Sequence, residues 1–182
     1  TKIVYDLSVP SGCTAATPCP AVIGTHGWGG DRKADRNNVR ARALARGFVT
    51  LSWDSRGFGQ SGDVTHVNSP EYEVRDALAL IDMLATRSEV AKDAPGDPRF
   101  GMVGGSYGGI IQMNVAGVDS RVDVIVPEIA HVGFNPVGVT REDKVEQPCC
   151  SKEVVVVRRV LLVPKCRWNG VFTAPLGQPT QR

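Results

Sequence analysis

The stretch DPRFGMVGGSYGGIIQM, residues 97–113, joins an apolar run to a glycine-rich turn that contains a single serine. Its centre, Gly104-Gly105-Ser106-Tyr107-Gly108, matches the pattern G-x-S-x-G. Between a strand and a helix, this pattern is typical of a nucleophile elbow, a strained turn that exposes the serine side chain. The glycines on either side keep neighbouring side chains out of the tight bend. The alternative is a glycine-rich turn whose serine only caps a helix.

The segments around this turn predict an α/β fold. Five short apolar runs lack strict alternation, which is typical of strands covered on both faces, as in a parallel sheet. Helical patterns lie between them. The regular alternation from about residue 20 to 130 predicts a doubly wound, mostly parallel sheet with helices on both faces. The expected strands are 2–9, 20–26, 48–53, 99–104 and 122–129, and the expected helices are 37–47, 69–87 and one that starts within 106–118.

The first two helices carry recognisable ends. Gly47 follows the first as a typical C-terminal glycine. In the second, Ser69 is expected as the N-cap and Pro70 as the first helical residue. The second helix has an apolar stripe that we expect to face the core, formed by Ala77, Leu80, Ile81 and Leu84.

A second glycine-rich loop follows an earlier strand. It reads His26-Gly27-Trp28-Gly29-Gly30. In an elbow architecture, a loop in this position supplies one backbone N–H to an oxyanion hole, and the residue after the nucleophile supplies the other. By position, these donors are the N–H groups of Trp28 and Tyr107. We expect His26 to brace the loop and not to act as a base.

A third motif, WDSRGFGQSG at 53–62, formally contains a dinucleotide-binding fingerprint at Gly57, Gly59 and Gly62. That fingerprint must open a helix directly, whereas DVTHVNSP follows here. We therefore predict a loop near the active-site face, pinned by Asp54 and Arg56.

The composition of the chain argues against several classes of function. The chain has 182 residues, enough for one sizeable core, and its net charge of +2 and 6% aromatic content do not favour a nucleic-acid partner. No apolar run is long enough to predict a membrane span. Cys13 and Cys19 predict a disulfide, with two free thiols as the alternative; a disulfide would favour an oxidising, secreted environment, although the localisation is otherwise open. We expect no metal or cofactor.

The three motifs together resemble the Xaa-Pro dipeptidyl-peptidase (S15) and cocaine-esterase-like (CocE/NonD) hydrolases of the α/β-hydrolase superfamily. The matching stretches cover roughly residues 1–130 and are HGWGG at 26–30, WDSRGFGQSG at 53–62, DAPGDPRFGMVGGSYGG at 93–109 and DSRVDVIVPEIA at 119–130. The resemblance implies a serine hydrolase that cleaves ester or amide bonds of small esters or short peptides through an acyl-enzyme. Ser106 would be the nucleophile, with Trp28 and Tyr107 at the oxyanion hole.

The C-terminal part departs from this family. Such hydrolases carry an acid and then a histidine after the serine, but this sequence has no histidine after His131 and no Asp or Glu after Glu153. We expect an α/β-hydrolase core over 1–130 without the later strands and cap, and an atypical tail over 131–182 with a net charge of +4 (eight basic and four acidic residues).

Three explanations remain for the departure. The chain is truncated or disrupted, or His131 acts with Glu128, or another chain or segment completes the site. The competing function is a catalytically impaired or inactive fragment that at most binds small molecules. The sequence leaves the oligomeric state open.

Overall fold

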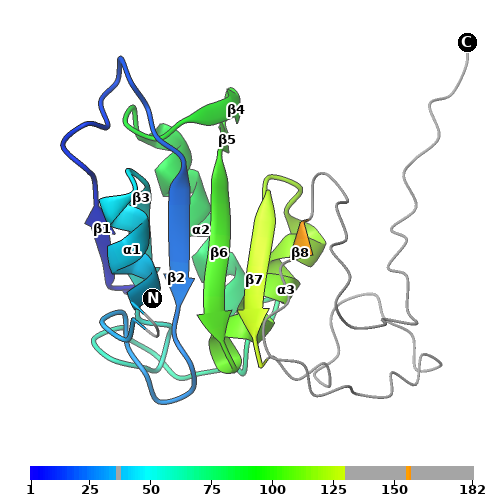
Figure 1. Cartoon of the computed structure of the whole chain (residues 1–182). Helices are drawn as coiled ribbons and strands as arrows, with labels where there is room; N and C mark the ends of the chain where they lie inside the picture. The colour runs from blue at the N-terminus through cyan, green and yellow to red at the C-terminus, as the bar shows by residue number, and fades with distance from the viewer. Residues whose placement is uncertain (36–37, 130–154, 157–182) are drawn as a thin grey trace, which may run out of the picture.

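The computed structural model describes residues 1–35, 38–129 and 155–156, and it contains a six-stranded sheet of strand order β1-β3-β2-β6-β7-β8 (Figure 1). The strands β2, β3, β6 and β7 are parallel to one another, whereas β1 and β8 pair antiparallel at the two edges. The bounds are β1 Tyr5–Ser8, β2 Ala21–Thr25, β3 Val49–Trp53, β6 Phe100–Gly105, β7 Val124–Glu128 and β8 Val155–Val156. A separate small pair is formed by β4 Lys92–Ala94 and β5 Asp97–Pro98.

Helices cover both faces of this sheet. One face carries α1 (Val39–Ala45), and the opposite face carries α2 (Glu73–Thr86) and α3 (Tyr107–Val118) (Figure 1). The chain passes from β2 through α1 to β3 on one side, and then through α2 to β6 on the other side of β2. The strand order therefore reverses between β2 and β6. In open α/β sheets, ligands bind at the carboxyl ends of the strands at such a switch point.

The predicted α/β-hydrolase-type sheet is confirmed, with two local differences. The first strand is antiparallel to β3. The second helix begins regularly at Glu73, because a turn at 69–72 comes first, in which the Tyr72 N–H donates to the Ser69 carbonyl over 3.2 Å. Ser69 still caps this turn, since its hydroxyl accepts the Glu71 N–H at 3.2 Å.

The core lies mainly between the sheet and α2 and α3. The whole predicted stripe of α2 is buried. By contrast, α1 has no buried residue, and its apolar side chains Val39, Ala43 and Leu44 are half-buried. The face of the sheet under α1 is therefore only partly covered.

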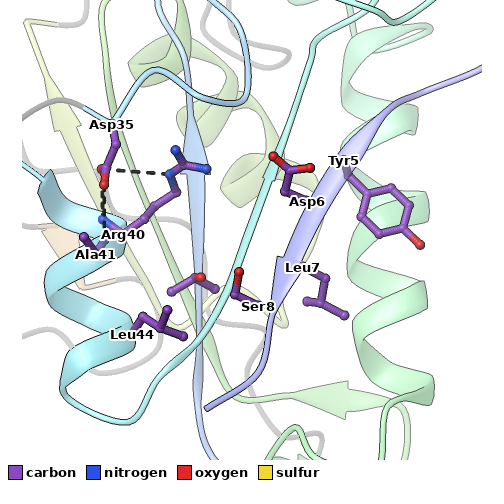
Figure 2. Close-up of a pocket in the computed structure, with 9 residues that line it drawn as sticks. Tyr5, Asp6, Leu7, Ser8, Asp35, Arg40, Ala41 and Leu44 are labelled. Atoms are coloured by element: carbon purple, nitrogen blue, oxygen red, sulfur yellow. Dashed lines mark hydrogen bonds and ion pairs between the residues drawn. The ribbon is translucent and has the colours of Figure 1, made fainter. Parts of the chain in front are cut away.

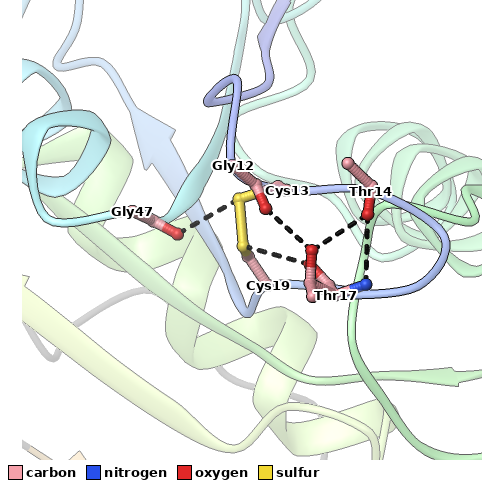
Figure 3. The surroundings of a disulfide bond; sticks show 6 residues. All are labelled: Gly12, Cys13, Thr14, Thr17, Cys19 and Gly47. Carbon is pink, nitrogen blue, oxygen red and sulfur yellow. Dashed lines mark hydrogen bonds between the residues drawn. A yellow bond between two sulfur atoms is a disulfide. The ribbon is translucent and has the colours of Figure 1, made fainter.

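The predicted disulfide between Cys13 and Cys19 is present in the loop that joins β1 to β2 (Figure 3). The two Cα atoms are 5.5 Å apart. The Sγ atom of Cys13 lies 3.4 Å from the carbonyl oxygen of Gly47, the glycine with φ 84° that ends α1 as predicted. This loop is thus fixed against the start of β3.

The expected division between a core and a tail falls on residues outside the described part, as does His131. Among the described helices, none has the length and apolar character that crossing a membrane requires.

Candidate active site

Ser106 lies between the end of β6 and the first residue of α3, at the switch point of the sheet. Its backbone has φ 55° and ψ −121°, a conformation that costs energy for any residue other than glycine, and the residue is exposed. The turn is held by its own backbone: the Ser106 N–H donates to the Glu128 carbonyl at 2.8 Å, and the Ser106 carbonyl accepts the Gly109 N–H at 2.9 Å. The strained, exposed serine has the geometry expected of an elbow.

The glycines of the elbow are required by the end of β2. A Cβ atom added to Gly108 would lie 2.6 Å from the His26 carbonyl oxygen and 2.7 Å from the Thr25 carbonyl oxygen. At Gly104 the added atom would overlap Thr25. Both contacts are closer than packed atoms tolerate. The two glycines of the G-x-S-x-G pattern are therefore needed because the turn lies so close to the end of β2.

A polar network that the sequence analysis missed joins the elbow to β2. Gln112 is fully buried, and its Nε2 atom lies 2.8 Å from the Gly108 carbonyl and 3.1 Å from the Gly104 carbonyl. The hydroxyl of Thr25 donates to the Gly108 carbonyl at 2.6 Å. The signal in the sequence was an amide side chain, six residues after Ser106, in a mostly apolar helix.

The loop at 26–30 passes directly beside the serine. A Cβ atom on Gly27 would lie 3.8 Å from the Cβ atom of Ser106. Among the described residues, neither the Trp28 N–H nor the Tyr107 N–H donates to another group. Both donors predicted for the oxyanion hole are thus uncommitted next to the elbow.

His26 is buried, and both of its ring nitrogens are engaged. The Ser55 N–H donates to Nε2 at 2.9 Å, so Nε2 is an acceptor and the proton resides on Nδ1. Nδ1 then donates to the Gly27 carbonyl at 2.8 Å. This neutral imidazole ties the 26–30 loop to the 53–62 loop, in agreement with its predicted bracing role.

Aromatic rings also connect the three motifs. The rings of Trp28, Phe58 and Tyr107 contact one another with centroid distances of 5.1 to 5.5 Å, and the imidazole of His26 meets Phe58 edge-on. Trp28 remains 61% exposed. The cluster therefore offers an open apolar surface next to the serine.

The 53–62 loop is organised around the buried carboxylate of Asp54. It accepts the Arg32 N–H at 2.6 Å, the Gln60 N–H at 2.8 Å and the Arg32 guanidinium at 2.6 Å. Burial by itself raises the pKa of Asp54, but these donors outweigh it and hold the pKa below its usual value. Gly59, with φ 55°, lies directly against the carboxylate. No helix opens after this loop before Glu73, so the loop is not a dinucleotide-binding turn.

Arg56 fixes the other end of the loop to α2. Its guanidinium binds the Asp76 carboxylate through two hydrogen bonds of 2.7 and 2.8 Å and lies 3.1 Å from Asp63. It also lies over the Tyr72 ring, 5.1 Å from the centroid. The hydrogen bond with Asp76 is the main cause that raises the pKa of Arg56. Asp54 and Arg56 therefore pin the loop as predicted.

The segment from Asp63 to Ser69 is a second feature that the sequence analysis missed. Asn68 is buried with φ 60°, and its side-chain amide donates to the Tyr107 carbonyl at 2.8 Å. The Asn114 amide donates in turn to the Asn68 carbonyl at 2.9 Å. Glu73, the first residue of α2, is buried and accepts the N–H groups of His66 and Ser69 at 2.5 and 2.9 Å. These contacts attach the segment to α3 directly behind the elbow.

A cavity of about 300 Å³ opens beside Ser106. Its wall includes the 26–28 loop, the end of β6, Arg40 of α1 and Glu128 at the end of β7. Glu128 thus lies on the same cavity as the serine, whereas its suggested partner His131 is outside the described residues. In the part of the chain that is described, no group of three or more His, Cys, Asp or Glu side chains is placed to hold a metal ion.

The fold and the arrangement of these loops define an α/β-hydrolase domain. The model of the X-Pro dipeptidyl-peptidase family (S15 family) matches residues 1–145, so the chain belongs to this family. The match extends beyond the residues that carried the resemblance in the sequence.

Individual proteins are similar to this chain in sequence or in fold. The uncharacterized protein PA2218 of Pseudomonas aeruginosa is 32% identical over 109 residues, which are 59% of this chain and 28% of that protein. Its crystal structure has a TM-score of 0.59 at 25% identity and covers 71% of this chain and 39% of its own. The structure of DcsB in complex with its substrate analogue has a TM-score of 0.59 at 21% identity. The match covers 70% of this chain and 41% of the DcsB chain. The chain therefore spans less than half the length of each of these relatives.

Proposed function

We propose that this protein is a serine hydrolase that cleaves ester or amide bonds of small acyl compounds or short peptides. The observation that carries the proposal is the exposed Ser106 at φ 55°, on a strand-to-helix turn beside two uncommitted backbone N–H groups. Membership of the X-Pro dipeptidyl-peptidase family supports the same reaction class.

In the proposed reaction, the Ser106 hydroxyl attacks the acyl carbonyl and the alcohol or amine leaves with a proton, which gives an acyl-enzyme. Water then attacks the acyl-enzyme, releases the acid and restores the hydroxyl. In both steps the Trp28 and Tyr107 N–H groups would donate to the negatively charged carbonyl oxygen. Because these donors are backbone groups on restrained loops, little reorganisation would be needed.

The proposal needs a proton acceptor for Ser106. Of the two described histidines, His26 is engaged at both nitrogens and His66 stacks on Tyr72 at a centroid distance of 3.7 Å. The role therefore falls to His131, with Glu128 as its carboxylate partner, or to a histidine supplied by another segment or another chain. If His131 is the base, His131→Ala lowers ester hydrolysis by several orders of magnitude. Unchanged hydrolysis would show that another segment or another chain supplies the imidazole.

Labelling with a fluorophosphonate probe tests the nucleophile. We expect the wild type to be labelled, Ser106→Ala to remain unlabelled, and Ser120→Ala, which alters an exposed serine just after α3, to be labelled like the wild type. Labelling that persists in Ser106→Ala would disprove the assignment.

The second candidate function is a catalytically silent domain that binds small acyl compounds. Among the described residues, neither His26 nor His66 forms a hydrogen bond with Ser106, which favours it. A folded wild type that binds an acyl compound by calorimetry, yet shows neither labelling nor ester hydrolysis, would select this function.

A further inference from the structure

Arg40, in the first turn of α1, is a partly buried cation with unused hydrogen-bond donors. A guanidinium carries five N–H groups. In Arg40, Nη1 donates to the Ser52 hydroxyl, while Nε is buried and has no hydrogen-bond acceptor among the described residues. The Asp35 carboxylate lies 3.9 Å from Nε, which is beyond hydrogen-bonding distance. A buried donor without a partner is uncommon in folded proteins and indicates that an acceptor is missing.

The position of Arg40 connects it to Ser106. Arg40 lies on the wall of the cavity of about 300 Å³ that contains the serine. It also lies on the wall of a groove of about 550 Å³ between β1 and α1, shown in Figure 2. Asp35 and Arg40 are the two residues common to both. Arg40 therefore borders the space that a molecule in the serine cavity would occupy.

Strand β2 fixes the direction of this side chain. A Cβ atom added to Gly24 would lie 2.9 Å from the Cδ atom of Arg40, so the aliphatic stem rests directly on the strand. The Ser52 hydroxyl on β3 holds the far end. A guanidinium restrained at both ends is preorganised to bind a ligand, because little side-chain entropy remains to be lost.

The neighbouring carboxylates are already engaged. Asp35 accepts the backbone N–H groups of Arg40 and Ala41 at 2.9 and 3.1 Å (Figure 2). Asp6, on the groove side, pairs with Arg32 at 3.1 Å. Glu128 faces the cavity at the serine end. Arg40 lies on the α1 side of the cavity, where a carboxylate would match its planar guanidinium.

We propose that Arg40 forms an anion subsite of the serine cavity and that the preferred substrates are esters whose acyl chain ends in a carboxylate. This inference rests on the proposed hydrolase function and specifies its substrate class. Hydrolysis of such a hemiester consumes one water, which supplies a proton to the departing alcohol and a hydroxyl to the acyl carbon. The product is a short dicarboxylate.

Two substrates of similar size test the subsite. These are 4-nitrophenyl hydrogen glutarate, which carries a terminal carboxylate at neutral pH, and 4-nitrophenyl pentanoate, which is neutral. We expect the wild-type kcat/KM to favour the glutarate ester by about tenfold or more, the scale of a hydrogen bond to a charged group. Arg40→Gln should abolish this preference, and Arg40→Lys should retain part of it. Arg42→Gln, which removes an exposed charge from the same helix, should retain all of it.

Binding of glutarate to the Ser106→Ala protein, measured by calorimetry, separates the subsite from catalysis. We expect binding that Arg40→Gln abolishes and Arg42→Gln preserves, with folding of each variant checked by circular dichroism. If the wild type hydrolyses no ester but binds glutarate through Arg40, the hydrolase proposal fails and the anion subsite stands. If the wild type hydrolyses both esters equally and glutarate does not bind, the subsite is disproved and the hydrolase proposal stands. The ester preference of the wild type and the binding of glutarate to the Ser106→Ala protein test the anion subsite even if Arg40→Gln does not fold.

Discussion

The elbow and the 53–69 segment meet at the same edge of the sheet, but different forces hold them. The elbow is fixed by close backbone contacts and neutral hydrogen bonds, from Thr25 and Gln112 to the glycine carbonyls. The 53–69 segment is fixed by buried charges, chiefly the pair of Asp54 with Arg32 and the pair of Arg56 with Asp76. The elbow should therefore be most sensitive to added atoms, and the neighbouring segment to lost charge.

The largest effect is expected from adding one methyl group to the elbow. Gly108→Ala places a Cβ atom within 2.7 Å of the carbonyl oxygens of Thr25, the last residue of β2, and His26, which follows it; both are backbone atoms and cannot easily move aside. We expect a loss of about 3 to 4 kcal/mol in the free energy of unfolding, at or above the upper end of overpacking effects. Denaturant titration monitored by circular dichroism measures it.

The matched control lies in the same helix. Gly117 has no atom within 4 Å of an added Cβ, so Gly117→Ala should stabilise the protein by about 0.5 to 1 kcal/mol through helix propensity. If both substitutions had the same effect, the close approach of α3 to β2 would not determine the choice of glycine.

The next effect tests the charged segment. Asp54→Asn removes the buried carboxylate from the Arg32 guanidinium, whose side chain is 12% exposed, and leaves it only the half-exposed carboxylate of Asp6. We expect the free energy of unfolding to fall by about 2 to 3 kcal/mol, because removing one member of a buried ion pair leaves the other charge buried without full compensation. Asp6→Asn removes the second carboxylate of the same arginine, which is 49% exposed, and should cost no more than about 0.5 kcal/mol. Similar losses in the two variants would mean that burial does not determine the strength of these pairs.

These two regions also differ in how far their sequence predicted them. The sharp turn at Ser106, the glycine-rich loop at 26–30 and the α/β order were predictable because glycine spacing and apolar runs are local signals. The buried stripe of α2 was predictable for the same reason. The roles of Thr25, Gln112 and Asn68 were not, because each depends on a partner brought close only by the fold: Gln112 and Thr25 are 87 positions apart.

The start of α2 shows the same limit. Ser69 and Pro70 gave a valid signal for a helix beginning, and Ser69 does cap a turn. The regular helix begins only at Glu73, since the Glu73 carboxylate is drawn into the 63–69 segment and accepts backbone N–H groups there. These partners are only seven and four positions away, but the Ser69-Pro70 signal does not specify them.

A smaller effect is expected where the two regions are joined, at Asn68. This residue contributes both a left-handed backbone and an amide donor to the Tyr107 carbonyl. Asn68→Gly can keep the left-handed backbone conformation but loses the hydrogen bond, so we expect the free energy of unfolding to fall by about 1 kcal/mol. Asn68→Ala loses both and should cost roughly 1 kcal/mol more. Equal losses in the two variants, measured by denaturant titration, would show that the backbone conformation carries no cost.

The smallest effect concerns pH and separates the buried charge of Asp54 from the neutral contacts of the elbow. Because the pKa of Asp54 is lower in the folded protein than in the unfolded chain, its contribution to stability is complete above about pH 4 and is lost as the pH falls through the folded pKa. One such group contributes a slope of at most about 1.4 kcal/mol per pH unit. Between pH 4 and pH 2, the unfolding free energy of Asp54→Asn should therefore decline less steeply than that of the wild type. All other carboxyl groups are common to both proteins, so parallel curves would mean that Asp54 titrates equally in the folded and unfolded states.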